Sequence, residues 1–485
     1  MTSTIEQVAH LAARVCSDLD GTPLADSAHD IRHRIEEPLR VAIAGRVKAG
    51  KSTLLNALIG DRLAPTDAGE CTKVVTWYRN GLTYRVLLHD VDGRIEPARF
   101  SRTDDQLDIT VGPDPSARLR RITVEWPAQS LEKMTLIDLP GVGSINDHIS
   151  ARSEQFLQTS ERPSEADAVL YLMRHLHDSD MSFLESFHDL DRSRPGVLNA
   201  IGVLSRADEI GVGLRSSMNT ARRIADRYTQ DSRLRPLCQT VVPLAGLLGE
   251  TAVTLRQHEF AALRELARGD ITPSLLSVDR FVAAADEGGP SREVRQRLLE
   301  RFGVFGLRTS CEYIRTGLTP TSPALANNLV QLSGLGELRA LLSTQFGGRH
   351  DVLRSWSALV ALRHLADNAE GLDPELVKEI ERITASTHAF SELRLLNLLR
   401  AGGGDLTPSE SKQAERLLGA SGAAAHDRLA APADTPLDQL AQIAIEHRRA
   451  WNELAEHPAR SLETRSAARV LTHSCEAIAA ASIHA

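Results

Sequence analysis

A glycine-rich loop constrains the fold of this chain more than any other feature of its sequence. Gly45-Arg46-Val47-Lys48-Ala49-Gly50-Lys51-Ser52 follows the mostly apolar run 39–44 and precedes a segment with leucines at helical spacing. When a strand turns through glycines into a helix, consecutive backbone N–H groups can surround a phosphate, and the helix dipole adds to the attraction. We therefore expect an α/β fold with a mainly parallel sheet flanked by helices.

The residues of this loop have distinct expected roles. Lys51 should reach the β- and γ-phosphates of a nucleotide, and Ser52 should ligate Mg²⁺. The other nucleotide contacts expected from the loop and the start of the helix are Gly45, Lys48, Ala49, Gly50 and Thr53. The loop thus predicts a nucleotide hydrolase.

A second motif, Asp138-Leu139-Pro140-Gly141, comes directly after the apolar run 134–137. An acidic residue there can hold the magnesium ion through water, and the Gly141 N–H can sense the γ-phosphate. Alone, this pattern could be a simple turn after a strand. Its position downstream of the glycine loop favours the functional interpretation.

Between these motifs, residues 69–73 form a predicted loop before a strand. GTPases place there a threonine that ligates magnesium only when the γ-phosphate is present. We expect Thr72 to be this ligand, with Thr66 and Thr76 as the nearby alternatives.

The base that the nucleotide carries is predicted from Ser205-Arg206-Ala207-Asp208, which follows the apolar run 200–204. A carboxylate can accept both the N1 and N2 hydrogens of guanine, a pair that adenine does not offer, and the stem of Arg206 can lie against the base. At the end of the last strand-like run, Leu244-Ala245-Gly246 is a weaker candidate for a loop that closes over the base. These residues predict GTP.

The chain of 485 residues is too long for one ordinary domain. Its strand-like runs are 74–78, 84–88, 122–126, 134–137, 168–173, 200–204 and 240–244. Past residue 250 the patterns become helical, as they also are near the N-terminus. We expect a helical arm at 1–37, a GTPase domain at 38–250, and an all-α bundle that forms a neck and trunk at 251–485.

Composition narrows the partners and the location. A net charge of −8 argues against a nucleic-acid partner. The five cysteines lack the spacing of a zinc site or a disulfide framework, which favours a reducing cytoplasm. No signal peptide is evident, and the apolar runs are far shorter than the about 20 residues that cross a bilayer. Any membrane contact should therefore be peripheral.

With these motifs in this order, the chain resembles the dynamin-like large GTPases, and it is more similar still to bacterial members, especially isoniazid-inducible mycobacterial ones. The similar stretches are 48–58, Glu70-Cys71-Thr72, 205–211, 277–282 and 387–396. They extend over nearly the whole chain.

The resemblance implies a GTPase head on a helical neck and trunk, which hydrolyses GTP to GDP and phosphate. It also implies head dimerisation or pairing with a related dynamin-like protein. The implied task is membrane remodelling or repair under cell-envelope stress, at the inner face of the cell membrane. From the residues alone, an Era-like regulatory or ribosome-assembly GTPase, or a GTP-gated helical scaffold with negligible turnover, remain alternatives.

The chain departs from the family pattern in its glycine loop. Dynamins commonly have Gln and Ser where this chain has Val47 and Lys48, and Val142 follows Gly141, so no residue is assigned to position the attacking water. Related guanylate-binding proteins carry an arginine at the offset of Lys48. We hypothesise that Lys48 is a catalytic cation, with a solvated loop lysine as the alternative.

A membrane-facing tip is a separate hypothesis. Segment 393–404 reads as an apolar helix that ends in a glycine loop, which would suit a trunk tip that enters lipid. A core helix with an exposed hairpin loop is the favoured interpretation.

Overall fold

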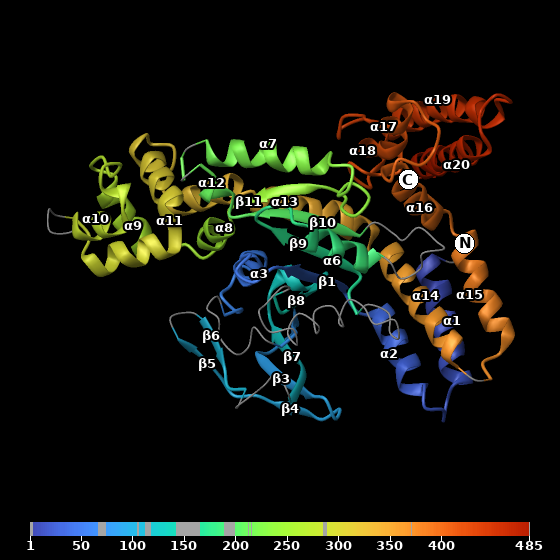
Figure 1. Ribbon diagram of the computed structural model, residues 1–485, viewed down its shortest axis with the longest axis horizontal. Coiled ribbons are helices and arrows are strands. Elements are labelled where there is room, and N and C mark those ends of the chain that lie inside the picture. Colours follow the sequence, from blue (N-terminus) through green and yellow to red (C-terminus); the bar gives the residue numbers. More distant parts are fainter. Residues whose placement is uncertain are drawn as a thin grey trace.

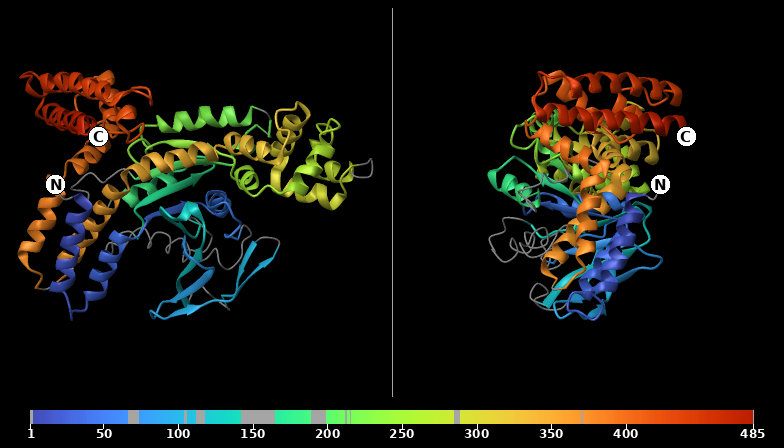
Figure 2. Two further views of the ribbon diagram at one scale, coloured as in Figure 1. Left: turned by 180° about the vertical axis from the view of Figure 1, so that it is seen from behind. Right: turned by 90° about the vertical axis from the view of Figure 1, so that its right-hand side faces the viewer.

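The structure is a computed structural model that describes residues 3–65, 74–103, 106–111, 118–141, 165–188, 199–211, 213–214, 216–284, 289–369 and 371–484. A central sheet is flanked by one group of helices at one end of the molecule and by two groups at the other (Figure 1). The same arrangement is seen from behind in Figure 2.

The sheet is built around β1 (Leu39–Gly45), in the order β11-β10-β9-β1-β8-β2-β7-β3-β4. Its other strands are β2 (Thr76–Asn80), β3 (Arg85–Asp90), β4 (Ile95–Pro97), β7 (Leu119–Trp126), β8 (Met134–Asp138), β9 (Ala168–Met173), β10 (Ala200–Ser205) and β11 (Val241–Leu244). Strands β8, β1, β9, β10 and β11 pair in parallel, while β2 runs antiparallel to β8 and β3 antiparallel to β7. The predicted mainly parallel sheet is confirmed.

Strand β1 is buried on both faces, which explains its continuous apolar stretch. Val41 and Ile43 belong to one hydrophobic cluster together with Leu54 of α3 (Lys51–Ile59). Ala42 and Ala44 belong to a second cluster, which includes residues of α6 (Asp178–His188) and α7 (Ser217–Thr229). Because successive side chains of a strand point to opposite faces, helices cover both sides of the strand that carries the glycine loop.

The chain after β11 is helical, as predicted. Its helices are α8 (Gly246–Val253), α9 (Gln257–Leu266), α10 (Val278–Ala283), α11 (Arg292–Arg315), α12 (Ser322–Leu332), α13 (Leu335–Leu341), α14 (His350–Asn368), α15 (Pro374–Ser386), α16 (His388–Arg400), α17 (Pro408–Leu417), α18 (Ala425–Leu429), α19 (Leu437–Glu456) and α20 (Leu462–His484). Helices α9 to α11 lie at one end of the sheet, and α14 to α20 lie toward the other (Figure 1).

The division of the chain at residue 250 stays a prediction. One hydrophobic cluster runs from the sheet through Leu248 and Ala252 to Leu298, Leu307 and Leu329. Helices on both sides of the predicted boundary therefore share a core with the sheet.

The N-terminal arm consists of α1 (Thr4–Asp18) and α2 (Ala25–Glu36), which pack with α14 and α15 in one apolar cluster. A buried ion pair joins this arm to the sheet: the Arg34 guanidinium donates to Asp167 Oδ1 from Nε at 3.2 Å and from Nη2 at 2.5 Å. Asp167 comes directly before β9 and also accepts a hydrogen bond from the Arg40 backbone N–H at 2.9 Å. The arm is thus joined to the start of β9, the strand whose other end lies beside Gly45 of the glycine loop.

The helical part of segment 393–404 packs inside the protein and its glycine loop is exposed at Ala401 and Gly402, so the structure agrees with the core-helix interpretation and contradicts a membrane tip that uses the apolar face of this helix. Leu396 and Leu399 are buried in a cluster with residues of α17 to α20. The buried Arg400 donates to the carbonyls of Cys238 and Gln239, at 2.9 and 2.6 Å. In the part of the chain that the structure describes, no helix has the length and apolarity to cross a membrane.

Candidate functional site

The glycine loop begins at Gly45, the last residue of β1, which lies tightly against β9. Gly45 has a φ of 144° and lies opposite Leu172, and a Cβ at this position would collide with the Leu172 carbonyl oxygen. Gly50 adopts a left-handed conformation, with a φ of 96°, as the N-cap of α3. The two glycines therefore let the chain leave a crowded strand end and present its backbone at a helix N-terminus, where phosphate is favoured.

Lys51 lies across this loop. Its Nζ donates to the carbonyls of Gly45 at 3.2 Å and Arg46 at 3.4 Å. Burial lowers the pKa of Lys51, and the Asp138 carboxylate opposes that shift. Among the described residues the hydrogen bonds of this partly desolvated ammonium go to neutral carbonyls, so its position suits the predicted contact with phosphate.

Asp138 and Ser52 meet beside the loop because β8 pairs in parallel with β1, which places Asp138 opposite Ile43. Ser52 Oγ donates to Asp138 Oδ2 at 3.2 Å. Burial raises the pKa of Asp138 to about 6, although Lys51 and Ser52 both act to lower it. Its Oδ1 is buried and has no hydrogen-bond partner among the described residues.

This arrangement fits a Mg²⁺ ion. A buried carboxylate oxygen without a partner is unfavourable unless a cation or a donor satisfies it, and Mg²⁺ prefers oxygen ligands and is often completed by phosphates. Ser52 and Asp138 thus lie where two of the three predicted metal ligands are needed. Thr72, its alternative Thr66 and the rest of the 69–73 loop lie outside the described residues.

The guanine-reading motif begins at the end of β10. Ser205 Oγ donates to the Met173 carbonyl at 3.3 Å, and Arg206 has a left-handed backbone with a φ of 52°. The Arg206 guanidinium donates to the carbonyl of Lys48 at 3.2 Å, which joins this motif to the glycine loop. Burial raises the pKa of Asp208. In the described part of the chain, no other residue donates a hydrogen bond to the Asp208 carboxylate.

A cavity of about 170 Å³ lies between the two motifs. Its lining includes the predicted residues Ala49, Gly50, Thr53, Ser205, Arg206, Asp208 and Gly246. Ala245 is fully buried beneath it and bonds through its backbone N–H to the Ser333 carbonyl at 2.9 Å. The structure therefore gathers residues from three separate segments around one cavity of the kind that the motifs predict.

Gly141 and Lys48 are two further predicted site residues near the glycine loop. Gly141 is so close to the glycine loop that a Cβ there would lie 2.5 Å from the Val47 side chain, which places the Asp138–Gly141 motif against it. Lys48 is exposed and has a left-handed backbone with a φ of 62°. Val142 lies outside the described residues.

Sequence reasoning missed Leu172, Glu209 and Leu247, which also line the cavity. Leu247 directly follows Gly246, so its proximity to a predicted site residue was a usable signal. Leu172 had none, because its position depends on the pairing of β9 with β1.

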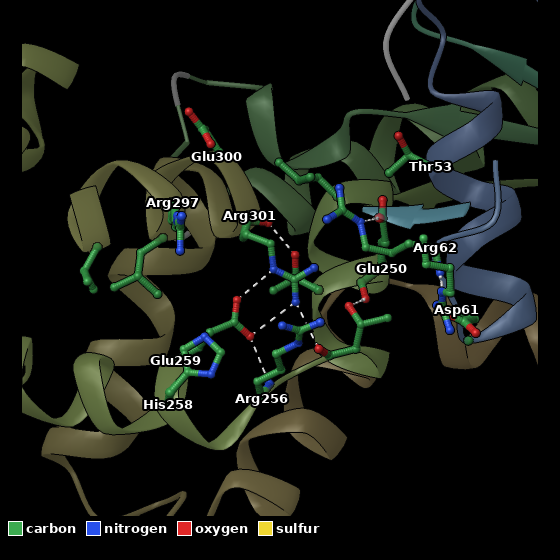
Figure 3. Close-up of a pocket in the computed structure, with 17 residues that line it drawn as sticks. Thr53, Asp61, Arg62, Glu250, Arg256, His258, Glu259, Arg297, Glu300 and Arg301 are labelled. Atoms are coloured by element: carbon green, nitrogen blue, oxygen red, sulfur yellow. Dashed lines mark hydrogen bonds and ion pairs between the residues drawn. The ribbon is translucent and has the colours of Figure 1, made fainter. Parts of the chain in front are cut away.

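A second, polar cavity of about 900 Å³ adjoins the first, since Thr53 and Leu247 line both. Ion pairs join its walls (Figure 3): Arg62 pairs with Glu250 of α8 at 2.9 Å, and Arg301 of α11 pairs with Glu259 of α9 at 2.8 Å. No sequence motif predicted this cavity. It connects the nucleotide-binding region to the helices after residue 250.

Comparison with known proteins agrees with the site. The family model described as the dynamin family matches residues 41–206. The isoniazid-induced protein IniC of Mycobacterium tuberculosis (strain ATCC 25618 / H37Rv) is 40% identical over 453 residues, which are 92% of this chain and 91% of that protein. The isoniazid-induced protein IniA of the same strain is 31% identical over 238 residues, 47% of this chain and 34% of that protein.

A bacterial dynamin-like protein of Nostoc punctiforme is 33% identical over 147 residues, 28% of this chain and 20% of that protein. The similarity to IniC extends through both the sheet and the helical half, so the predicted resemblance is confirmed. The chain therefore belongs to the dynamin family and is a GTPase.

Proposed function

We propose that the two motifs around the small cavity bind GTP in the predicted manner. The glycine loop would hold the phosphates, with Gly45, Ala49, Gly50 and Thr53 presenting backbone groups and Lys51 its ammonium. Ser205, Arg206 and Asp208 would read guanine beside Gly246, with Ala245 supporting the loop. The observation that carries this proposal is the lining of the cavity by the glycine loop and the Asp208 turn together.

The metal in this proposal is Mg²⁺, held by Ser52, Asp138 and Thr72, with Gly141 next to the γ-phosphate. When bound, such an ion would neutralise phosphate charge. Ser52 and Asp138 orient one another through their 3.2 Å hydrogen bond. Lys51, on the same side of the loop, would neutralise phosphate charge directly.

Lys48 is proposed as a further catalytic cation. Its side chain is exposed beside the glycine loop, so it can turn toward the phosphates or toward a second GTPase head. A cation placed where negative charge develops in the transition state accelerates phosphoryl transfer.

We further propose that GTP hydrolysis drives peripheral membrane remodelling or repair at the inner face of the cell membrane, in the cell-envelope stress response. Support comes from the family, from the helical groups attached to both ends of the sheet, and from a relative named for its induction by isoniazid. The proposed partners are GTP and GDP, membrane lipid, and a second head of the same or a related dynamin-like chain. No nucleic acid is involved in this proposal.

The turnover part is tested by measuring GTP hydrolysis per mole of protein over a wide range of protein concentration. If two heads cooperate, the specific rate rises with concentration. The control is Lys51→Ala, which should bind GTP weakly and stay inactive at every concentration. A slow rate that does not depend on concentration would instead favour a GTP-gated scaffold.

The membrane part is tested by flotation of the full chain with anionic vesicles, in GDP and in a non-hydrolysable GTP analogue. The proposal predicts more floated protein with the analogue. Lys51→Ala should show no nucleotide-dependent difference. If the wild-type protein stays unbound in both nucleotides and on neutral vesicles as well, the membrane role is wrong while the GTPase activity stands.

A further inference from the structure

Helix α11 is broken in its middle, directly beside the predicted guanine reader. Gly303 has a φ of 62° and a ψ of 178° inside the helix, a backbone conformation that is open essentially only to glycine. A Cβ built at this position would lie 4.0 Å from Asp208 Oδ2 and 3.8 Å from Leu247 Cδ2. Asp208 and Leu247 both line the small cavity, so the kink lies immediately behind its wall.

The second half of α11 also supports the turn that carries Asp208. Gly213 packs against this half, since a Cβ at Gly213 would lie 3.7 Å from Phe305 N and 3.8 Å from the Asp208 carbonyl oxygen. Arg308 Nη1 donates to the Gly213 carbonyl at 2.5 Å. The turn after β10 is therefore held by α11 as well as by the sheet.

The kink itself is fixed by α8, the helix that begins at the base loop. Thr251 Oγ1 donates to the Arg301 carbonyl, and the Arg301 guanidinium donates to the Thr254 carbonyl at 3.0 Å. One turn farther along α11, Gly306 lets the helix approach Leu248 so closely that a Cβ would lie 2.8 Å from its Cδ1. These contacts leave the break in α11 little freedom to move relative to the cavity.

We propose that the kinked centre of α11, residues 303–308, is a positioning element for guanine recognition, and that Gly303 and Arg308 contribute to selectivity by fixing the Asp208 carboxylate. The inference rests on the proposed role of Asp208. Two parallel hydrogen bonds to the N1 and N2 hydrogens of guanine require the carboxylate to be held within about 0.5 Å of its productive position. Among the described residues, this carboxylate accepts a hydrogen bond only from its own backbone N–H, so its position also depends on the packing behind it.

Gly303→Ala should disturb this position through the backbone. The added methyl group would lie at ordinary contact distances from Asp208 and Leu247, but alanine does not adopt the observed φ and ψ without strain. The kink must then shift, and with it the wall that contacts Asp208. Arg308→Met removes the hydrogen bond to Gly213 while it keeps most of the stem, and it tests the same role without changing the kink.

The experiment measures the affinities of the full chain for GDP and IDP by calorimetric titration. The hypoxanthine base of IDP lacks the N2 amine, so the GDP-to-IDP affinity ratio reports on the second hydrogen bond to Asp208. For the wild-type chain we expect a ratio on the order of tenfold, as for one hydrogen bond to a charged group. Gly303→Ala and Arg308→Met should lower this ratio toward one, because a displaced carboxylate weakens two hydrogen bonds to GDP but only the N1 hydrogen bond to IDP.

Gly317→Ala is the matched control. It makes the same change at another positive φ, 75°, beyond the end of α11 and with no neighbour within 4 Å. Its affinity ratio should equal that of the wild-type chain. A helical circular dichroism spectrum confirms that each variant is folded.

Asp208→Asn distinguishes a failure of this inference from a failure of the proposal that Asp208 binds guanine. If Asp208→Asn lowers the ratio but neither Gly303→Ala nor Arg308→Met does, α11 does not position the carboxylate and the inference is wrong. An equal loss of GDP and IDP affinity in those two variants, or a lowered ratio in Gly317→Ala, would also overturn it. If Asp208→Asn leaves the ratio unchanged, the assignment of Asp208 to guanine is itself wrong.

Discussion

Lys48 offers the sharpest test of the proposed chemistry, because two substitutions can separate the effect of its backbone conformation from the effect of its side-chain charge. The residue has a φ of 62°, and its side chain is exposed. A left-handed conformation costs a non-glycine residue about 1 kcal/mol. Glycine at this position would relieve that strain, whereas alanine would keep it, and both would remove the ammonium.

The expected effects on stability are small. Lys48→Gly gains about 1 kcal/mol from relief of strain and loses roughly 0.5–1 kcal/mol to the greater freedom of glycine in the unfolded chain. Lys48→Ala removes an exposed side chain, which changes stability by about 0.5 kcal/mol or less. Neither substitution should therefore unfold the loop.

The expected effect on catalysis is large if Lys48 is a catalytic cation. Removal of one group that stabilises transition-state charge lowers kcat on the order of 10²–10³-fold, or about 3–4 kcal/mol. Lys48→Ala and Lys48→Gly should show the same loss, and Lys48→Arg should retain most of the activity because it keeps the positive charge.

The assay is steady-state GTP hydrolysis at a protein concentration at which the wild-type rate no longer rises, together with direct titration of GDP. Lys51→Ala is the reference variant that should lose nucleotide affinity. Unchanged kcat in Lys48→Ala and Lys48→Gly, with lost binding in Lys51→Ala, would show that Lys48 is a solvated loop lysine. A loss only in Lys48→Gly would point to the backbone instead of the charge.

Three further substitutions test other parts of the structure. Ser52→Ala should raise the Mg²⁺ concentration needed for half-maximal hydrolysis, measured by magnesium titration, and an unchanged requirement would remove Ser52 from the metal site. Arg34→Met should lower the free energy of unfolding by roughly 3 kcal/mol in urea titration, because Asp167 stays buried without its partner; a change below about 1 kcal/mol contradicts this. Burial would raise the pKa of Glu392, but a hydrogen bond with His388 and the charge of Arg428 lower it to about 2. The stabilisation from this charge is complete above the unfolded pKa near 4.5 and is lost as the pH falls toward 2, so Glu392→Gln should destabilise the protein at pH 7 and less at pH 3.

The sequence predicted the sheet well because parallel strands buried on both faces are continuous apolar runs. Each run predicted as a strand overlaps an observed strand. Strand β4 and the hairpin of β5 (Phe100–Thr103) and β6 (Gln106–Ile109) were missed, because they are three or four residues long and β4 is fully exposed. Such short segments give no periodicity to recognise.

The site could be predicted only where its residues form local motifs. The glycine loop and the Asp208 turn are each contiguous in sequence, so their roles could be predicted from the sequence alone. The hydrogen bond from Arg206 to Lys48 and the kink at Gly303 depend on pairings between distant segments. The sequence of residues 294–313 has helical spacing throughout and contains two glycines, Gly303 and Gly306, and nothing in it shows that the helix breaks at the first of them, beside the base pocket.

Strand β9 gives the N-terminal arm a fixed relation to the nucleotide cavity. Leu172, near its carboxyl end, lines the cavity and crowds Gly45, while Asp167, directly before its amino end, holds Arg34 of α2. All six residues of the strand are buried, so it moves with the sheet as one body. If nucleotide moves the arm, we therefore expect the change at the Arg34–Asp167 contact or within the helices beyond it, because β9 is close-packed along its whole length.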